Sequence, residues 1–543
     1  MQYGILSARK SPLNPPKLLH LELWIMYTND ERQLHLPATE FSFYGMPLDL
    51  TNRWVQLAKI IPWDVIEDEY VKNFPEARRG GEARSARFAL GTLIIKEYLN
   101  LSDRETVQQI RENPYMQYFL GEAGYHYDIP LDPSSLTYFR KRFTADELKQ
   151  WNHKIISQHN GEQESQAQTQ TQVEEPTPDP TPVPEAADDP ESAPAAESDE
   201  DKREDKDSGA SNHGTLILDA TCAPADIQYP TDVRLLHESR RKLERMMDHL
   251  QEGRKEPKPR NYRDVADREY KRFARKRRPT RREIRKAVCK QLGYVRRDLE
   301  IVLAMQKDSE AELSRKEQRY LETISKLYAQ QKEMYDERKN HCEDRIVSIH
   351  QPHVRPIKRG KARAETEFGA KLSIAMVKGY ADVTRISWKA YNESGDLIGE
   401  VERYRERWGF YPERVLGDKI YRTRNNLAYC AKHGIRMSGP ALGRPPADKK
   451  VYAEQKEQER REAGERNAVE GKFGEGKRSY GLQRLRCHLE ETSESEIVLI
   501  FLVMNLKKVL RDLFVAFLGR LLDELKSVFS EYSYLDFASS AAA

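Results

Sequence analysis

The sequence predicts an α/β core, built as a mixed sheet flanked by helices, with an all-α N-terminal domain before it and a long helical insertion within it. Three observations predict this class. Residues 215–222 (TLILDATC) form a short apolar run, which is typical of a buried strand. Residues 370–377 and 383–391 flank a turn at 378–381, which predicts a hairpin. Helical spacing of apolar residues dominates the chain before the run and between the run and the hairpin.

Residues 1–158 are predicted to form the N-terminal helical domain. Residues 83–99 have the length and apolar spacing of a buried helix. Two capping-box signals mark the starts of later helices: Ser102 with Glu105, and Thr144 with Glu147.

A short basic helix is predicted near the end of this domain, at residues 134–143 (SSLTYFRKRF). Its apolar side chains form one stripe, and its cations fall largely away from that stripe; they are Arg140, Lys141 and Arg142. Such a helix could enter a DNA groove or follow a phosphate backbone. An ordinary amphipathic helix is the alternative.

The net charge of +3 combines two opposite blocks. Between Gly161 and Asp207, 16 acidic residues stand against 3 basic ones, in a low-complexity stretch that has almost no large apolar side chains. Such a composition cannot repay its ordering entropy, so we predict a disordered acidic linker over 159–212. The rest of the chain is correspondingly basic, which favours a polyanion, most simply nucleic acid, as the partner. Solvated basic helices are the alternative.

The insertion is predicted over residues 231–349. Apolar residues keep helical and partly heptad spacing there, which predicts two long antiparallel helices of coiled-coil character. A basic, proline-containing connector at 254–282 joins them, and it includes Arg275, Lys276, Arg277 and Arg278. This connector could bind flanking or target DNA, whereas the long helices could instead form a dimer contact.

The core is predicted to occupy residues 213–230 and 350–530, and residues 531–543 form a C-terminal tail. After the hairpin, the pattern predicts helices at 395–408, 425–433, 450–471 and 494–528, with short strands at 414–416 and 435–438.

Several classes of protein are excluded by composition. No apolar run approaches the ~20 residues that a membrane-spanning helix needs, and the N-terminus lacks a signal-peptide core. The five cysteines lie far apart with no C-x-x-C pair, which disfavours a disulfide framework and a structural zinc site. We therefore expect a protein of the reducing cytoplasm.

Two aspartates follow predicted apolar strands. Asp219 closes the run Leu216–Leu218, and Asp418 follows Val415, Leu416 and Gly417. If the two strands are neighbours and end at one sheet edge, their carboxylates lie side by side. Mg²⁺ or Mn²⁺ would neutralise such a pair, because both ions prefer hard oxygen ligands. A lone aspartate after a strand is, however, more often a cap or a turn residue.

A third acid is offered by the helix that is predicted to end near Gly471. Arg466 and Glu470 are four residues apart and share a helical face. Lys477 shares that face only if the helix continues; otherwise a glycine-rich turn must bring it back. A basic pair around a metal-binding acid suits a phosphodiester substrate, because Arg and Lys hold phosphate oxygens while the acid holds metal.

Other acids compete for these positions. Asp226 and Asp232 lie near the first aspartate, but neither follows the apolar run directly, and Asp232 precedes a helix and suits a cap. Glu475 competes with Glu470, but it stands between two glycines, beyond the predicted end of the helix.

With these residues in place, the sequence resembles the DDE transposases of bacterial insertion sequences. The matching stretches are LILDATCAPADIQYPTDVRLL, VLGDKIYRTRNNLAYCAKHGI and RNAVEGKFGEGKRSYGL. One branch of the family carries the signature Y-x2-R-x3-E-x6-K. Arg466, Glu470 and Lys477 match it, whereas Ala463 stands at the tyrosine position.

The resemblance implies a ribonuclease H-like core and assigns roles to its residues. Asp219, Asp418 and Glu470 would hold two Mg²⁺ (or Mn²⁺) ions, and Arg466 and Lys477 would contact phosphates. The implied reaction is metal-dependent nicking at the element ends, followed by attack of the 3'-hydroxyl on target DNA. The implied partners are double-stranded DNA, as terminal inverted repeats and as target, and a second copy of the chain. The N-terminal domain would help to bind the element end, and the protein would act at the bacterial nucleoid.

Two alternatives remain open at this point. One is a two-metal DNA nuclease that lacks strand transfer. The other is a non-catalytic DNA-binding scaffold derived from a transposase. The same three acids serve the first, and their presence disfavours the second.

Overall fold

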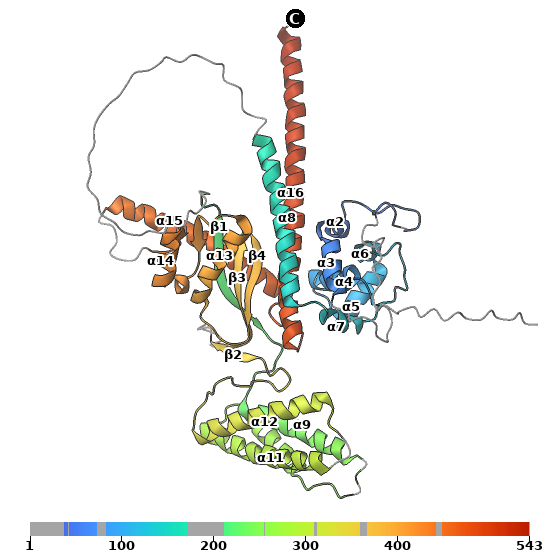
Figure 1. Ribbon diagram of the computed structural model, residues 1–543, viewed down its shortest axis with the longest axis vertical. Helices are drawn as coiled ribbons and strands as arrows, with labels where there is room; N and C mark the ends of the chain where they lie inside the picture. The colour runs from blue at the N-terminus through green and yellow to red at the C-terminus, as the bar shows by residue number, and fades with distance from the viewer. Residues whose placement is uncertain are drawn as a thin grey trace, which may run out of the picture.

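The computed structural model describes residues 37–541, except 42, 73–82, 172–210, 253, 255, 309–311, 359–365 and 441–447. Figure 1 shows its parts: a sheet with flanking helices, a helical N-terminal region, two long helices between them and a separate helical bundle. The predicted C-terminal tail and most of the predicted acidic linker lie outside the described side chains.

The sheet is organised around β1, which has a partner on each side. Its strands are β1 (Thr215–Pro224), β2 (Arg355–Lys358), β3 (Thr366–Val377), β4 (Tyr380–Ser387), β5 (Arg414–Leu416) and β6 (Arg436–Met437). On one side of β1 lies antiparallel β3, which in turn pairs with antiparallel β4 and β2. On the other side lie β5 and then β6, both parallel to β1. The sheet is therefore mixed, as predicted.

The predicted hairpin is confirmed, but its turn is shorter than expected. Only Lys378 and Gly379 separate β3 from β4, and both have positive φ, of 49° and 81°. Positive φ at both central residues is the geometry that two-residue hairpins favour, because it matches the twist of the strands. Strand β3 also begins earlier than predicted, at Thr366, since β2 and β1 both pair with its first half.

Alternation along β1 directs its side chains to two different cores. Leu216 and Leu218 pack with α13 (Leu397–Trp408), whereas Ile217 packs in the core that contains α16 (Glu490–Ala541). Since side chains of a strand alternate between faces, Asp219 lies on the Ile217 face. That face is the one against which α15 (Lys449–Ser479) packs through Val469 and Phe473.

The remaining elements of the core are short. They are the 3-10 helices η1 (Glu393–Asp396) and η2 (Lys419–Tyr421) and the helix α14 (Arg424–Lys432). The helices predicted at 395–408 and 425–433 and the strand at 435–438 are thus confirmed, with small shifts in their ends.

The N-terminal region is helical over its described residues. Its helices are α2 (Arg53–Ile60), α3 (Trp63–Val71), α4 (Ala86–Leu99), α5 (Asp103–Glu112), α6 (Pro114–Phe119), α7 (Ser135–Arg140) and α8 (Ala145–Thr171). Both predicted caps form: the Ser102 side chain accepts the Glu105 N–H at 3.2 Å, and Thr144 and Glu147 cap each other reciprocally. Helix α8 continues to Thr171, so the first part of the predicted linker is helical rather than disordered.

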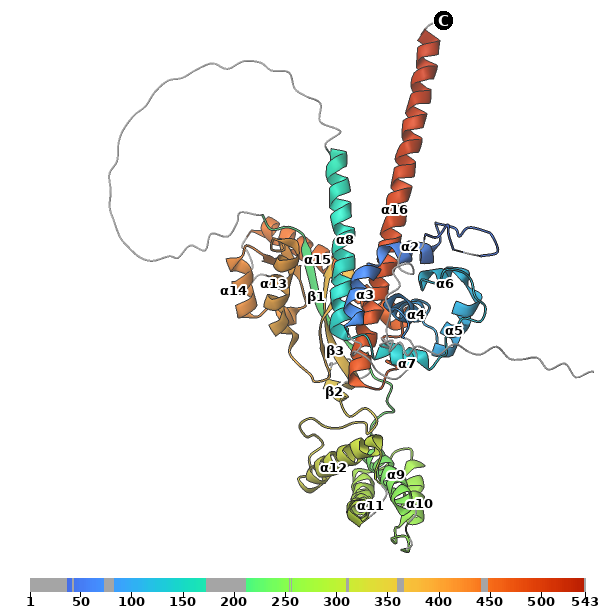
Figure 2. The same ribbon diagram turned by 45° about the vertical axis from the view of Figure 1, so that its right-hand side comes forward.

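Helices α8 and α16 lie side by side in both views and connect the N-terminal region to the sheet (Figures 1 and 2). The buried Asn505 side chain of α16 donates to Asn152 Oδ1 at 2.9 Å and to the Ala381 carbonyl at 2.7 Å. Its own oxygen accepts the Ala381 N–H at 3.1 Å. One amide therefore joins α16 to α8 and to β4.

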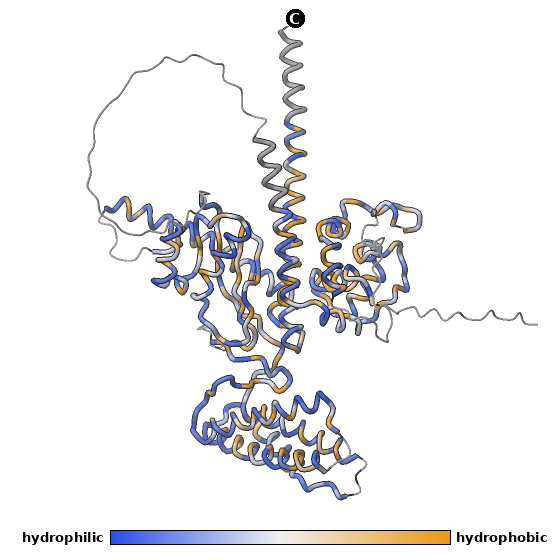
Figure 3. The backbone as a smooth tube through the Cα atoms, viewed as in Figure 1, coloured by the Kyte–Doolittle hydropathy of each residue, from blue (hydrophilic) through white to orange (hydrophobic). Residues whose placement is uncertain are grey.

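The outer part of α16 leaves the body of the molecule (Figure 3). Several of its large apolar side chains are exposed there: Leu513, Phe514, Val515, Phe517, Leu518, Leu521, Leu522 and Leu525. Among the described residues, no helix is both long enough and apolar enough to span a bilayer.

Over its described residues, the helical insertion has four helices where two were predicted. They are α9 (Asp232–Gln251), α10 (Arg263–Ala274), α11 (Arg281–Asp308) and α12 (Arg315–Asp336). The additional helix α10 lies within the stretch predicted as a connector. The apolar residues that suggested two coiled-coil helices instead form one shared core, which includes Leu243, Val295 and Ile324.

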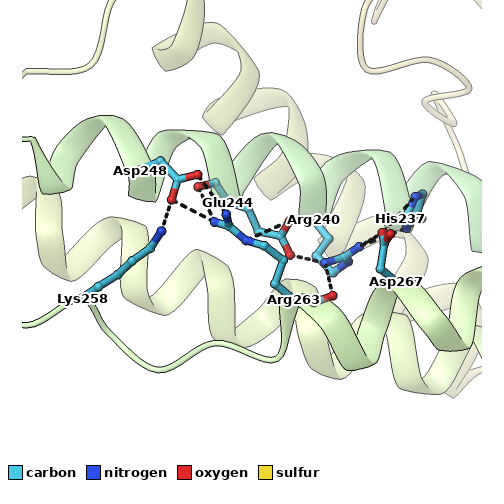
Figure 4. Close-up of polar contacts among 7 residues, drawn as sticks. All are labelled: His237, Arg240, Glu244, Asp248, Lys258, Arg263 and Asp267. Atoms are coloured by element: carbon cyan, nitrogen blue, oxygen red, sulfur yellow. Dashed lines mark hydrogen bonds and ion pairs between the residues drawn. The ribbon is translucent and has the colours of Figure 1, made fainter.

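A chain of buried and half-buried charges joins α9 to α10 (Figure 4). Arg240 is 1% exposed; it pairs with Glu244 on its own helix and with Asp267 of α10 at 2.9 Å. Arg263 binds Asp248 at 2.9 Å in the same way. These ion pairs act together with buried Ala266 and with Tyr270 and Phe273, which pack against the shared core, to hold α10 in place.

Asp298 of α11 is buried beside this chain of charges. The pKa of its carboxyl is raised to about 7, because burial and, to a smaller extent, Glu244 raise it by more than Arg240, Arg297 and Arg263 lower it. The folded insertion therefore favours protonated Asp298.

Replacing Asn505 tests the connection between α16 and the sheet. Asn505→Ala leaves the N–H and C=O of buried Ala381 unpaired, so we expect a loss of about 2–4 kcal/mol in the free energy of unfolding. Denaturant unfolding followed by circular dichroism measures this loss, with exposed Asp523→Asn on the same helix as the control. A loss below about 0.5 kcal/mol would contradict this assignment.

The buried carboxyl of Asp298 predicts a pH-dependent stability of the insertion. Because its folded pKa is raised, its contribution to stability is lost as pH rises from about 4, the unfolded value, to about 7. Asp298→Asn removes this loss of stability. The backbone amides of α9 and α11 should therefore exchange hydrogen more slowly in the variant than in the wild-type protein, and the difference in exchange rate should be larger at about pH 8 than at about pH 5. Exposed Glu300→Gln serves as the control, and an equal margin at both pH values would refute the interpretation.

Candidate active site

The register of the sheet brings two of the predicted acids together. The last parallel pair between β1 and β5 is Ile217 with Leu416. Asp219 and Asp418 each stand two residues beyond that pair, Asp219 within β1 and Asp418 just after the end of parallel β5. The prediction that Asp219 ends a strand is nevertheless wrong, because β1 continues to Pro224 along antiparallel β3. Only the parallel pairing ends here, and that is sufficient to align the two carboxylates.

Asp219 is a partly buried carboxylate among other acids. Its side chain is 18% exposed and accepts the Ala220 N–H at 2.7 Å. Burial raises the pKa of Asp219, and the negative charges of Asp418 and Glu470 raise it further, whereas the Ala220 N–H and Arg466 lower it. The electrostatic effect of both other acids on this pKa indicates that all three lie in one neighbourhood.

Asp418 sits on a turn that several contacts hold in place. Its carboxylate accepts the Lys419 N–H at 2.7 Å, and the preceding Gly417 N–H donates to Ser438 Oγ at 3.1 Å. The Tyr421 ring packs so closely on Gly417 that a Cβ atom there would lie 3.2 Å from it. These contacts fix the direction in which the chain leaves β5, and hence the place of the exposed Asp418.

Arg466 lies between the first and third acids. Its guanidinium is 3.9 Å from Asp219 Oδ2 and 3.6 Å from Glu470 Oε1, measured from its two terminal nitrogens. Glu470 is 60% exposed, whereas Arg466 is 23% exposed. The structure therefore brings Asp219, Glu470 and Arg466 into one constellation, with Asp418 next to it.

Helix α15 is longer than predicted and continues to Ser479. Arg466, Glu470 and Lys477 therefore share a continuous helix, and no glycine-rich turn is needed to bring Lys477 back. Gly471 does not end the helix, and Glu475 lies inside it, 3.5 Å from Lys472 Nζ. The argument that Glu475 falls beyond the helix is thus wrong, although it remains paired with Lys472 and not with Arg466.

Two ion pairs that the sequence did not reveal position α15 over the sheet. Arg414 of β5 binds Glu465 at 2.7 Å, and Arg436 of β6 binds Glu462 at 2.6 Å. Both acids precede Arg466 by no more than about one helical turn. The only sequence signal for them is an arginine within each short strand, which cannot be assigned to a partner without the fold.

The competing acids have other partners. Asp226 binds Arg484 at 2.8 Å, and Asp232 binds Arg345 at 2.6 Å and Gln331 at 2.9 Å. Asp232 lies in the first turn of α9 after Thr231, without capping it.

The three acids are suited to a hard cation, but they are not closed around one. Within the described ranges, no three His, Cys, Asp or Glu residues are close enough together to hold a metal ion. The donor set itself consists of carboxylate oxygens, which Mg²⁺ and Mn²⁺ prefer. Asp219 in particular experiences the repulsion that a cation would relieve.

The basic residues predicted on α7 have different environments. Arg140 pairs with Asp103, and Arg142 donates to the Tyr70 hydroxyl at 2.7 Å. Lys141 is exposed and lies 6.0 Å from the centre of the Tyr138 ring. Two of the three cations therefore contact residues of their own domain. A helix that enters a DNA groove needs a free basic face, and this segment does not present one.

The basic connector is exposed, as predicted. Arg275, Lys276, Arg277 and Arg278 lie in the turn between α10 and α11, and Lys276 pairs with Glu283. Lys276 lines the same cavity as Val233 at the start of α9. The cluster therefore lies at the end of the insertion where the chain arrives from β1.

Comparisons with known proteins identify two segments of the chain. Residues 46–142 match the family described as Transposase domain (DUF772), and residues 415–507 match the family described as Transposase DDE domain. The chain is also 32% identical, over 96 residues, to a protein of Rhizobium meliloti named "Uncharacterized protein ORF8 in nfe locus". That match covers 18% of this chain and 45% of the relative, so the chain spans less than half of the relative's length. No solved structure shows significant similarity.

The second family match spans Asp418, Arg466, Glu470 and Lys477, and the first spans α2 to α7. The resemblance of this chain to the DDE transposases of insertion sequences is thereby confirmed, and the chain carries two transposase domains.

Proposed function

We propose that this chain is a DNA transposase that hydrolyses phosphodiester bonds at the ends of an insertion sequence and transfers the resulting strands to target DNA. The observation that carries the proposal is the placement of Arg466 between Asp219 and Glu470, with Asp418 aligned beside Asp219. Two transposase domains in the same chain support it.

We propose further that the core belongs to the ribonuclease H-like class. Three antiparallel strands in the order β4, β3, β1 support this, as do two parallel strands, β5 and β6, on the other side of β1. In that set of five, Asp219 lies within the first strand, Asp418 follows the fourth, and Glu470 lies on the helix α15 that comes after them.

Asp219, Asp418 and Glu470 would hold two Mg²⁺ (or Mn²⁺) ions. Such ions, when bound, activate the attacking hydroxyl and stabilise the leaving oxygen. The chain itself supplies three carboxylates from three separate segments, so the middle of β1, the turn after β5 and the position of α15 would together set the site. We infer that Arg466 balances the acids in the absence of a ligand and can contact a phosphate when DNA is bound.

Lys477 lies two further turns along α15, where it could contact a neighbouring phosphate. Arg275, Lys276, Arg277 and Arg278 would contact flanking or target DNA, because the connector is exposed and lies near the core. We expect two copies of the chain to act together, since an element has two ends to process.

Substituting the acids tests catalysis. We expect Asp219→Asn, Asp418→Asn and Glu470→Gln each to lower metal-dependent cleavage of DNA by roughly a hundredfold or more. Removing a residue that binds the metal directly should lower activity at least as much as removing a residue that only orients a metal ligand. Cleavage of labelled plasmid with and without Mg²⁺ measures the effect. Glu475→Gln on the same helix is the matched control and should retain activity.

Full activity in the Asp418→Asn variant would refute the assignment, and no cleavage by the wild-type protein would favour the scaffold alternative. A second assay separates the transposase from a nuclease. A duplex with a free 3'-hydroxyl end, incubated with target plasmid, should become joined to it, whereas a nuclease would cut without joining.

A further inference from the structure

A cavity of about 510 Å³ lies between the two transposase domains. One wall comes from the start of α5 and the end of α7, within the first matched segment. The other wall comes from the loop before α16 and from its first turns, within the second matched segment. Its charged lining includes Arg104, Arg140, Lys141, Arg486 and Glu496. The cavity therefore exists only when both domains are assembled.

The acids in and under this cavity already have partners. Asp103 pairs with Arg140, and the buried Glu97 pairs with Lys96. The Glu496 carboxylate accepts the backbone N–H groups of residues 486 and 487, at 3.4 and 3.0 Å. Asp103 and Glu97 are thus neutralised by cations, whereas Glu496, bound by neutral N–H groups, keeps one negative charge.

Three cations at the cavity have no acidic partner among the described residues. Arg104 and Lys141 are exposed and form no hydrogen bond or ion pair there through their side chains. Arg486 donates only to neutral oxygens, the Leu101 carbonyl at 3.1 Å and Asn100 Oδ1 at 3.3 Å. These three cations outnumber the one unneutralised carboxylate named above, Glu496, and an excess of positive charge favours an anion as ligand.

An exposed aromatic ring lies beside one of these cations, Lys141. Tyr138 of α7 is 62% exposed, and the Lys141 ammonium lies 6.0 Å from its ring centre. Exposed aromatic rings next to basic side chains are typical of nucleic-acid surfaces, where bases stack and phosphates pair. The cavity is also far larger than a single phosphate needs, and its volume falls in the range of pockets that hold nucleotide-sized ligands.

We propose that this cavity binds consecutive phosphates of a DNA strand, so that both domains hold the same DNA molecule. The proposal rests on the proposed function. The chain leads from Glu470 and Lys477 to the end of α15 and then through the loop that carries Arg486. Arg104 and Lys141 supply the phosphate contacts from the N-terminal side, and Arg486 supplies them from the catalytic side.

The salt dependence of DNA binding tests this proposal. A double variant, Arg104→Gln with Lys141→Gln, should reduce the slope of log affinity against log salt by about 2, because each lost phosphate contact releases about one counterion fewer. The probe is a short duplex of arbitrary sequence in a KCl series without divalent ions. The matched control is Arg319→Gln with Lys326→Gln on exposed positions of α12.

Binding is measured apart from cleavage, so this test remains informative if the protein does not cut DNA. An unchanged slope in a variant that keeps the wild-type thermal midpoint would overturn the proposal. A second arm adds a free deoxynucleoside monophosphate. One outcome is that the nucleotide raises the thermal midpoint of the wild-type protein but not that of the variant, while wild type and variant show the same salt slope for DNA binding. In that case the cavity binds a free nucleotide and not DNA, and the proposal is likewise wrong.

Discussion

The pairing of β1 with β3 on one side and with β5 on the other is the constraint on which the candidate site depends. Antiparallel β3 extends β1 beyond Asp219, whereas parallel β5 stops at Leu416. Asp219 therefore occupies a rigid position within a strand, and Asp418 occupies the first turn after one. Gly369 shows how close the strands are, because a Cβ there would lie 2.1 Å from the Ala223 carbonyl oxygen. Changing that ladder would move the first acid and the start of the insertion together.

Much of this arrangement could be predicted from sequence, because its signals are local. The β3–β4 hairpin follows from Gly379 and the alternation around it, and the helix starts at Ser102 and Thr144 follow from side chains that cap nearby N–H groups. The grouping of Asp219 with Asp418 followed from apolar runs of the right length. The register of β1 and β5 brings the two residues near each other, although the premise that a strand ends at Asp219 was wrong.

What could not be predicted depends on partners distant in sequence. Helix α10 was missed because its residues are polar, and the pairing of Arg240 with Asp267 stabilises it only once α9 is in place. In the same way, the sequence shows Arg140 only as a basic residue of an amphipathic helix, and the fold is what brings Asp103 into contact with it. A charged side chain has no preferred partner in a sequence, whereas an apolar one needs only to be buried. The structure therefore differs most from the sequence-based predictions at the charged surfaces.

Two glycines in helix α15 affect the mobility of the segment between them. Gly464 and Gly471 flank the stretch that carries Arg466 and Glu470, and a side chain at either glycine would meet nothing within 4 Å. Packing does not require glycine there, and each glycine weakens a helix by roughly 0.5–1 kcal/mol relative to alanine. Glu470 thus stands on a stretch of α15 bounded by two glycines, between the buried anchors Val469 and Phe473. We therefore expect the position of Glu470 to adjust more readily than that of Asp219, which lies within a strand paired with β3.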